Sequence, residues 1–218
     1  MAKLVVFDLD GTLCDTIYDI EFCLNQTLSH FGYPTRSQQQ VRDAICAQLR
    51  ELIRFSMEEK DVSNPKIDEC VEYYQDLINK SGYSRTPLFK GIEKVIPALK
   101  KAGYNIAILT NKDNIEVDVV AHKLFAEFNF DKIVGLDGKI IPKPDPTELY
   151  NIMAEFGASK EDTYFVGDGD TDVMVALNAG VNLIAVTYGY RSEEFLRTLG
   201  ATTFANTPEE ILPLIIKD

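Results

Sequence analysis

Two aspartates two residues apart follow the first apolar run of the chain. Asp8 and Asp10 belong to the stretch VVFDLDGT over residues 5–12. Side chains of a strand alternate between its faces, but a Gly-containing turn after the strand lets both carboxylates point into one crevice beyond its carboxyl end. Two like charges held together need a cation or a shared proton to offset them. The pair therefore indicates Mg²⁺ chemistry, and the alternative is an ordinary turn of Asp and Gly.

Two further stretches carry groups that could hold an anion. Thr110 and Asn111 follow the apolar run 106–109 and could donate to phosphate oxygens, or could simply cap a turn. Lys143 opens the sequence KPDP over residues 143–146. Prolines restrict the backbone, which suits a lysine that must place its ammonium beside a dianion. A solvated lysine in a proline-rich loop is the alternative interpretation.

A fourth stretch is rich in acids. The sequence GDGDTD over residues 167–172 supplies Asp168, Asp170 and Asp172. These carboxylates would repel one another without a cation, although acids at a helix N-terminus are the alternative. The glutamate that would close a calcium-binding loop of the EF-hand type is missing, because that position holds Ala179.

The elements that must position these groups alternate along the chain. Apolar, β-branched runs predict buried strands over residues 4–7, 106–109, 132–134, 164–166 and 183–186. Helical stretches lie between them, over residues 91–102, 114–125, 147–156 and 171–179. This alternation predicts an α/β fold with a doubly wound, Rossmann-like parallel sheet.

The segment after the first strand breaks the alternation. It has no clear buried strand, and its apolar residues show helical spacing at Ile17, Ile20, Leu24 and Leu28, and again at Ile45, Leu49, Leu52 and Ile53. Gly and Pro mark the return of the chain over residues 81–87. We therefore expect a core of residues 1–14 and 87–218, and an all-helical cap of residues 15–86 that could exclude water from the acids.

Composition restricts the partners and the compartment. The 218 residues can bury a large interior, and a formal net charge of −12 would repel nucleic acid and anionic membranes. The four cysteines include no CxxC pair, which favours a reduced compartment over a zinc site or a disulfide framework. The apolar run before Asp8 is too short for a signal peptide, and no later run is long enough to span a membrane. We expect a soluble, cytoplasmic monomer.

Taken together and in this order, the four stretches resemble the motifs of the haloacid dehalogenase (HAD) superfamily of phosphohydrolases. The segment expected to form the cap resembles that of the branch that includes phosphoglycolate phosphatases, β-phosphoglucomutases and pyrophosphatases. Residues 186–191, VTYGYR, are similar to the phosphoglycolate phosphatase-like subset. The resemblance implies a Mg²⁺-dependent phosphatase whose substrate is a small-molecule phosphate ester.

The resemblance also implies roles for the acids. Asp8 would attack phosphorus to form an aspartyl-phosphate and would bind Mg²⁺. Asp10 would act as general acid and base, while its backbone carbonyl reaches the metal. Asp168 would be a direct metal ligand. Asp172 would lie in the outer shell, where it holds a metal-bound water or orients Lys143, and Asp170 has no assigned role.

The remaining groups would surround the transferring phosphoryl group. The resemblance assigns this role to Lys143, Thr110, Asn111 and the amides near Gly11, and phosphoryl transfer depends mainly on positioning and charge stabilisation.

Other functions of the same branch require residues that can be checked in the sequence. A pyrophosphatase or nucleotide phosphatase is the main alternative. Phosphoglucomutases carry a histidine that would fall at position 20, which is Ile20 here, and phosphonate hydrolases need a cap lysine that residues 46–55 do not supply. A phosphate-sensing protein without turnover is disfavoured, because every expected catalytic residue type is present.

The expected cap departs from the phosphatase pattern in one place. Residues 41–46 resemble its specificity segment, but a glycine that is usual there is Cys46. Arg50 and Arg54 lie four residues apart on one predicted helix face, either towards solvent or towards a substrate carboxylate or second phosphate. The identity of the phosphate ester does not follow from these residues.

Overall fold

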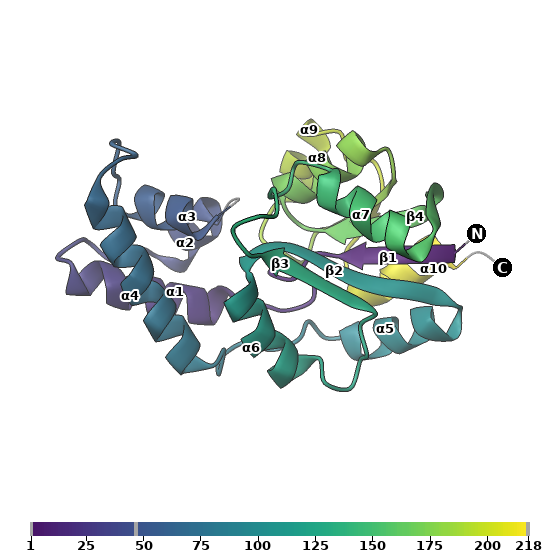
Figure 1. Cartoon of the computed structure of the whole chain (residues 1–218), viewed down its shortest axis with the longest axis horizontal. Helices are drawn as coiled ribbons and strands as arrows, with labels where there is room; N and C mark the ends of the chain where they lie inside the picture. Colours follow the sequence, from purple (N-terminus) through teal and green to yellow (C-terminus); the bar gives the residue numbers. More distant parts are fainter. Residues whose placement is uncertain (1, 46–47, 217–218) are drawn as a thin grey trace.

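Six parallel strands form the central sheet of the molecule. The computed structural model describes residues 2–45 and 48–216. Its strands lie in the order β3-β2-β1-β4-β5-β6, and Figure 1 labels the first four of these. Their bounds are Ala2–Phe7 (β1), Tyr104–Asp113 (β2), Lys132–Leu136 (β3), Ala158–Gly167 (β4), Asn182–Val186 (β5) and Phe204–Ala205 (β6). All five pairings are parallel, so the predicted α/β sheet is confirmed.

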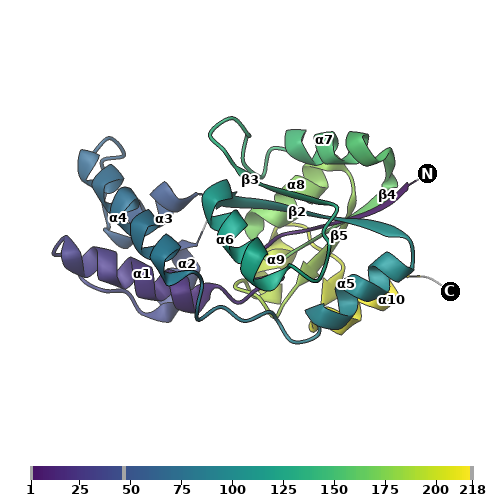
Figure 2. The ribbon, with the colours of Figure 1, turned by 60° about the horizontal axis from the view of Figure 1, so that its bottom comes forward.

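Helices cover both faces of this sheet, as Figure 2 shows. Their bounds are Ile92–Lys101 (α5), Asn114–Leu124 (α6), Thr147–Phe156 (α7), Asp170–Ala179 (α8), Glu193–Thr198 (α9) and Ile211–Ile215 (α10). Along β1, Val5 and Phe7 pack in one buried cluster with residues of α5, α6 and α10. The alternate residues, Leu4 and Val6, pack in a second cluster with α7 and α8. The near-continuous apolar sequence of β1 follows from this burial on both faces.

Four helices between β1 and α5 gather beyond the end of the sheet at which β1 finishes (Figure 1). Their bounds are Ile17–His30 (α1), Gln38–Ala44 (α2), Leu49–Ser56 (α3) and Pro65–Ser81 (α4). Helix α4 packs against α1 and α3, and α2 packs against both α1 and α3. The apolar residues that predicted a helix over α1 are all buried, namely Ile17, Ile20, Leu24 and Leu28. Their spacing therefore identified the face of α1 that packs inwards.

The second helical spacing does not mark one helix. Ile45 follows the end of α2 with an extended backbone (ψ 113°), and α3 begins only at Leu49 after the N-cap residue Gln48. Ile45, Leu49 and Leu52 lie on both sides of this break and line one pocket, so the apolar spacing continues across it. Cys46, which departs from the phosphatase pattern, lies outside the described residues.

The two connections between the four helices and the sheet lie side by side. The Asp15 amide donates to the carbonyl of Pro87 over 3.0 Å. The buried carboxylate of Asp19, in the first turn of α1, accepts hydrogen bonds of 2.8 Å from the Arg85 amide and from the Thr86 hydroxyl. One carboxylate therefore ties the outgoing chain to the returning chain.

Short elements near the C-terminal end of the described chain have no counterpart among the predicted elements. Strand β6 has two residues, and the 3₁₀ helix Pro208–Glu210 (η1) has three. Such lengths are too short for a hydrophobic period to be recognised. Among the described residues, no helix combines the length and apolar character that crossing a bilayer requires.

We predict that Asp19→Asn weakens the junction between the two connections. Both hydrogen bonds end on the same oxygen, Oδ2, so the amide can keep them but removes the charge that strengthens them, and its NH2 group would face the Arg85 guanidinium, which lies 3.4 Å from Oδ1. The expected cost is about 1–3 kcal/mol. Denaturant unfolding should show this loss, and limited proteolysis should show faster cleavage near Arg85. The matched control is Asp76→Asn on α4, whose side chain is 58% exposed and which should change stability by less than about 0.5 kcal/mol. Equal stability of both variants would contradict the prediction.

Candidate active site

Three carboxylates converge where β1 and β4 end. Phe7 of β1 lies beside Val166 of β4 in the parallel register, so the residues that follow both strands meet at one edge of the sheet. Asp8, Asp168 and Asp172 each offer an oxygen, and these oxygens all lie within 4.8 Å of one another. The structure therefore brings together three of the four aspartates that the sequence analysis assigned to a metal.

One lysine faces this acidic cluster. The Lys143 ammonium lies 2.9 Å from Asp8 Oδ1 and 2.6 Å from Asp172 Oδ1, and its side chain is 2% exposed. The Asn111 side chain fixes the lysine backbone: its Nδ2 donates to the Lys143 carbonyl over 2.9 Å, and its Oδ1 accepts from the Lys143 amide over 2.8 Å. Asn111 thus positions the lysine, whereas the sequence analysis expected its amide to contact phosphate.

The cluster keeps an excess of negative charge. Burial raises the pKa of Asp8 to about 6, and the nearby Asp172 adds to this rise while Lys143 opposes it. Burial also raises the pKa of Asp168, helped by the charges of Asp172 and Asp8. Three ionised carboxylates and one ammonium leave two negative charges, which a divalent cation would neutralise. Oxygen donors of this kind fit Mg²⁺, a hard cation that takes one or two carboxylates and keeps several waters.

Hydrogen bonds fix the orientation of two members of the cluster. Asp168 accepts from the Thr12 hydroxyl over 2.9 Å and from the Tyr190 amide over 2.7 Å. Asp172 accepts from the Gly169 amide over 2.8 Å through the oxygen that does not meet Lys143. Asp172 therefore has both oxygens engaged by the protein.

Gly11 contributes space to the site. Its backbone φ is +80°, and a Cβ at this position would lie 2.3 Å from an oxygen of Asp168. Only glycine accommodates both constraints. The Gly11 amide already donates to the Cys14 carbonyl over 2.9 Å, whereas the sequence analysis expected amides near Gly11 to surround phosphate.

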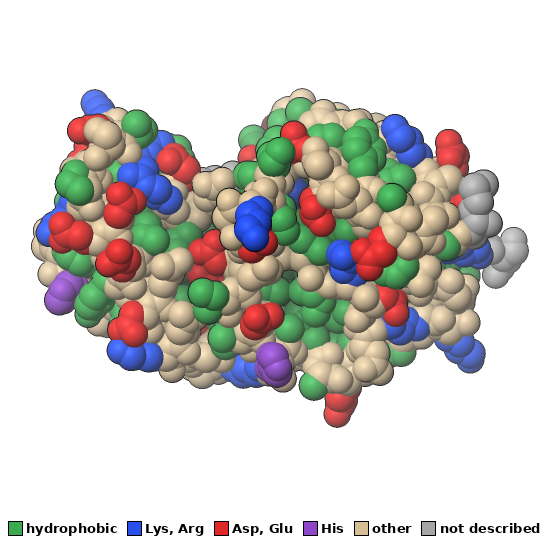
Figure 3. All heavy atoms as spheres, viewed as in Figure 1, with side chains coloured by type: hydrophobic (Ala, Val, Ile, Leu, Met, Phe, Trp, Pro, Cys, Tyr) green, Lys and Arg blue, Asp and Glu red, His purple; other side chains and the backbone are tan. Residues whose placement is uncertain are grey.

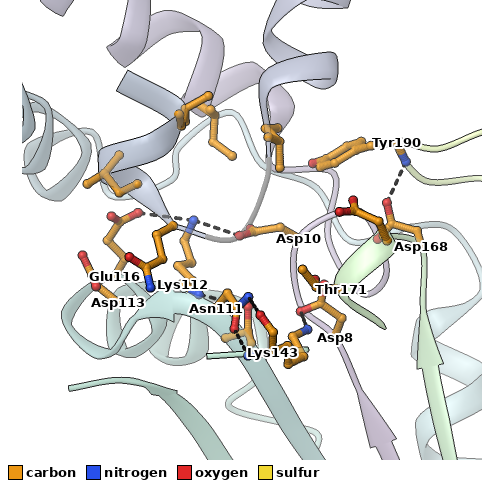
Figure 4. Close-up of a pocket in the computed structure, with 18 of the residues that line it drawn as sticks. Asp8, Asp10, Asn111, Lys112, Asp113, Glu116, Lys143, Asp168, Thr171 and Tyr190 are labelled. Carbon is orange, nitrogen blue, oxygen red and sulfur yellow. Dashed lines mark hydrogen bonds and ion pairs between the residues drawn. The ribbon is translucent and has the colours of Figure 1, made fainter. Parts of the chain in front are cut away.

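Asp10 points away from the acidic cluster. Its Oδ2 accepts from the Lys112 ammonium over 3.1 Å, and this ammonium also lies 3.2 Å from Glu116 Oε2 (Figure 4). Thr110 is buried and lines the same pocket. The two aspartates of the first motif thus face different surroundings, one beside the other acids and one beside a lysine.

The pocket that contains these groups lies between the sheet and the four helices, where the surface in Figure 3 is notched. The four-helix segment contributes a largely apolar wall of Ile20, Ile45, Leu49, Leu52 and Tyr74. From the other side, the Arg191 guanidinium donates to the carbonyls of Arg42 and Ile45 over 2.6 Å each, and its Nε lies 3.6 Å from Asp170 Oδ1. Asp170 thereby joins the contact between the two sides.

Two arginines that the sequence analysis considered as substrate contacts bind neighbouring groups instead. Arg50 pairs with Asp68 over 2.7 Å, and Arg54 pairs with Glu51 over 2.6 Å. Neither arginine is among the described residues that line the pocket. These contacts favour the interpretation that both side chains stabilise the helices.

Several pocket residues escaped the sequence analysis. Lys112, Glu116, Tyr74 and Tyr190 line the pocket, but no motif assigned them a role. The position of Lys112, two residues after Thr110 at the end of a predicted strand, was the available signal. Glu116 and Tyr74 lie within helices and show no local pattern that separates them from other helical residues.

The fold, the order of the four motifs and their meeting at one sheet edge define a class of enzyme. The chain belongs to the haloacid dehalogenase-like hydrolase family, which it matches over residues 5–186. The resemblance drawn from the sequence is confirmed, and so is the assignment of the chain as a hydrolytic enzyme.

Similar proteins are phosphatases. The chain is 28% identical to phosphoglycolate phosphatase from Vibrio parahaemolyticus over 98% of its length and 96% of that protein. It is 30% identical to phosphoglycolate phosphatase 1 from Pseudomonas aeruginosa, over 98% of this chain and 79% of that protein.

Solved structures share the whole fold. A haloacid dehalogenase-like family hydrolase from Streptococcus pneumoniae superposes with a TM-score of 0.86 at 24% identity, covering 99% of each chain. A crystal structure described as a predicted phosphatase from Clostridium acetobutylicum has a TM-score of 0.84 at 26% identity and also covers 99% of each chain.

We predict that removing the Asp8 charge stabilises the metal-free protein at neutral pH. The folded state holds the Asp8 proton up to a pKa of about 6, against an ordinary value of 3.8. Stability is therefore lost as pH rises from the ordinary value to the raised one. In EDTA, Asp8→Asn should gain on the order of 3 kcal/mol over the wild type at about pH 7, and less than about 1 kcal/mol at about pH 4.

Mg²⁺ provides the matched comparison. Denaturant unfolding at about pH 7 should show that Mg²⁺ raises the stability of the wild type more than that of Asp8→Asn. A stability difference independent of both pH and Mg²⁺ would contradict the charge argument.

Proposed function

We propose that the protein is a Mg²⁺-dependent phosphatase that hydrolyses a small, phosphoglycolate-like phosphomonoester through an aspartyl-phosphate at Asp8. The observation that carries this proposal is the position of Asp8, within hydrogen-bonding distance of the Lys143 ammonium and beside Asp168 at the pocket. Family membership and the phosphatase relatives support it.

In the proposed reaction Asp8 attacks phosphorus while the bond from phosphorus to the ester oxygen breaks. Asp10 donates a proton to that leaving oxygen. Water then attacks phosphorus of the aspartyl-phosphate, Asp10 accepts a proton from this water, and phosphate leaves with Asp8 restored. Lys143 stabilises the negative charge of the transferring group, and Thr110 donates to its oxygens.

Asp8, Asp168 and the backbone carbonyl of Asp10 would hold Mg²⁺, with Asp172 in the outer shell. The bound cation would offset the charge of the carboxylates and of the phosphoryl group. Asp172 fits an outer position because one of its oxygens pairs with the Lys143 ammonium and the other accepts from the Gly169 amide, whereas the oxygens of Asp168 accept from neutral groups, the Thr12 hydroxyl and the Tyr190 amide. Asn111 would orient Lys143 through its two backbone contacts, and Gly11 leaves room for Asp168.

We also propose that residues 15–86 act as a cap on a core of residues 1–14 and 87–218. Support comes from the pocket, because both parts line it. The histidine that a phosphoglucomutase would need is replaced by Ile20, which lines the pocket, and this favours hydrolysis over isomerisation. We further propose that the protein is a cytoplasmic monomer. The free thiols of Cys14, Cys23 and Cys70, all buried, are consistent with a reducing compartment.

The proposal predicts phosphate release from a panel of phosphomonoesters, including phosphoglycolate, that requires both Mg²⁺ and Asp8. EDTA should abolish turnover, and Asp8→Asn should lower kcat by roughly 10³-fold or more. Borohydride treatment of acid-quenched enzyme should reduce the acyl phosphate and place homoserine at position 8, which mass spectrometry detects.

The matched control is Asp145→Asn, an acid near Lys143 that accepts from the Thr147 amide and does not line the pocket. It should keep its activity. Pyrophosphate and nucleotides in the same panel test the alternative substrates. Turnover that persists in Asp8→Asn would refute the aspartyl-phosphate route.

A further inference from the structure

Lys112 is a buried cation between two carboxylates. Its side chain is 6% exposed, and its ammonium lies 3.1 Å from Asp10 and 3.2 Å from Glu116, whose side chain is 5% exposed. Figure 4 shows Lys112 between these two acids, with Asp10 reaching towards it from the loop that follows β1. A buried ammonium requires such partners, because burying an unpaired charge is costly.

The contact with Lys112 engages one oxygen of Asp10. Oδ2 accepts the hydrogen bond, whereas Oδ1 is buried without a hydrogen-bond partner among the described residues. A carboxyl held by one oxygen keeps the other available for proton transfer. Lys112 itself is engaged by two acids, which argues against a role as a free substrate-binding cation.

Glu116 connects Lys112 to the returning connection. The Tyr83 hydroxyl donates to Glu116 Oε2, and the Lys112 ammonium lies 4.8 Å from the centre of the Tyr83 ring. Tyr83 is fully buried and stands two residues after the end of α4. Its carbonyl accepts a hydrogen bond from Lys123 of α6. The contacts thus run from the loop of Asp10, through β2 and α6, to the segment that leaves the four helices.

We propose that Lys112 is a positioning residue that orients the Asp10 carboxyl towards the leaving oxygen, and that Glu116 and Tyr83 hold Lys112 in place. The inference rests on the proposed function, in which Asp10 protonates that oxygen. None of the three residues needs to touch phosphate.

The leaving group provides a test that a merely structural role would not pass. An alkoxide leaves poorly unless it is protonated, whereas p-nitrophenolate leaves without a proton. Loss of Asp10 orientation should therefore slow formation of the aspartyl-phosphate from alkyl phosphates and spare its formation from p-nitrophenyl phosphate, whereas the later attack of water is common to both substrates. Loss of general structure or of phosphate binding would slow both substrates alike.

The experiment measures kcat and KM of Lys112→Met on the best alkyl phosphate of the panel and on p-nitrophenyl phosphate. We expect kcat/KM, which reports the steps up to formation of the aspartyl-phosphate, to fall about 10²-fold on the alkyl ester and less than about 5-fold on the aryl ester. Tyr83→Phe should show the same selectivity with a smaller loss. The matched control is Lys94→Met, a lysine whose side chain is 64% exposed in a surface ion pair, and it should match the wild type on both esters.

A second variant tests whether a loss of activity comes from misfolding. Lys112→Met leaves Glu116 buried without its cation, so Lys112→Met/Glu116→Gln removes both charges and should retain the fold, which circular dichroism and thermal unfolding check. Its expected kinetics are those of Lys112→Met. Equal losses of kcat/KM on both esters, or no loss of kcat/KM on the alkyl ester in a folded variant, would overturn the proposal.

Asp10→Asn separates this inference from the function on which it rests. If Asp10→Asn slows the alkyl ester selectively and the Lys112 variants do not, only the positioning role of Lys112 fails. If Asp10→Asn itself shows no selectivity, the acid role of Asp10 fails and the inference fails with it.

Discussion

Burial of like charges at the ends of adjacent strands is the constraint on which the site depends. Parallel pairing of β1 with β4 places Asp8 beside Asp168 and Asp172 whether or not their repulsion is relieved. Lys143 relieves part of it, and its own position depends on two hydrogen bonds between its backbone and the Asn111 side chain. The neighbouring turn accommodates Asp168 only because Gly11 lacks a side chain. Much of the local sequence therefore positions these charged side chains.

The two sides of the pocket differ in chemistry. The edge of the sheet supplies nearly all its charged groups, and the four helices supply apolar side chains together with Gln48. Arg191 joins the sides through two backbone carbonyls, and Gln75 of α4 donates to Asp113 over 3.0 Å. The charged and the apolar groups of the pocket thus come from different parts of one chain, which these polar contacts join.

Sequence patterns predicted the sheet well because its strands are buried on both faces and its helices are amphipathic. The same patterns located Asp8, Asp168 and Lys143, since each follows or precedes a regular element at the active edge. They could not show that Asn111 turns towards the Lys143 backbone, because that contact joins segments 32 residues apart. The contact of Lys112 with Asp10 is also long-range, spanning 102 residues. The interruption between α2 and α3 was not predicted, because apolar spacing shows which way side chains face and not whether the helix continues.

The hydrogen bond between Asp15 and Pro87 has a consequence for how this chain could diversify. A segment that leaves and re-enters a domain at neighbouring points can be exchanged for another with equally close ends, and the strands on either side keep their register. The sheet edge would then act as a constant module, and new substrates could be acquired by replacing the inserted helices while the phosphoryl-transfer groups stay unaltered.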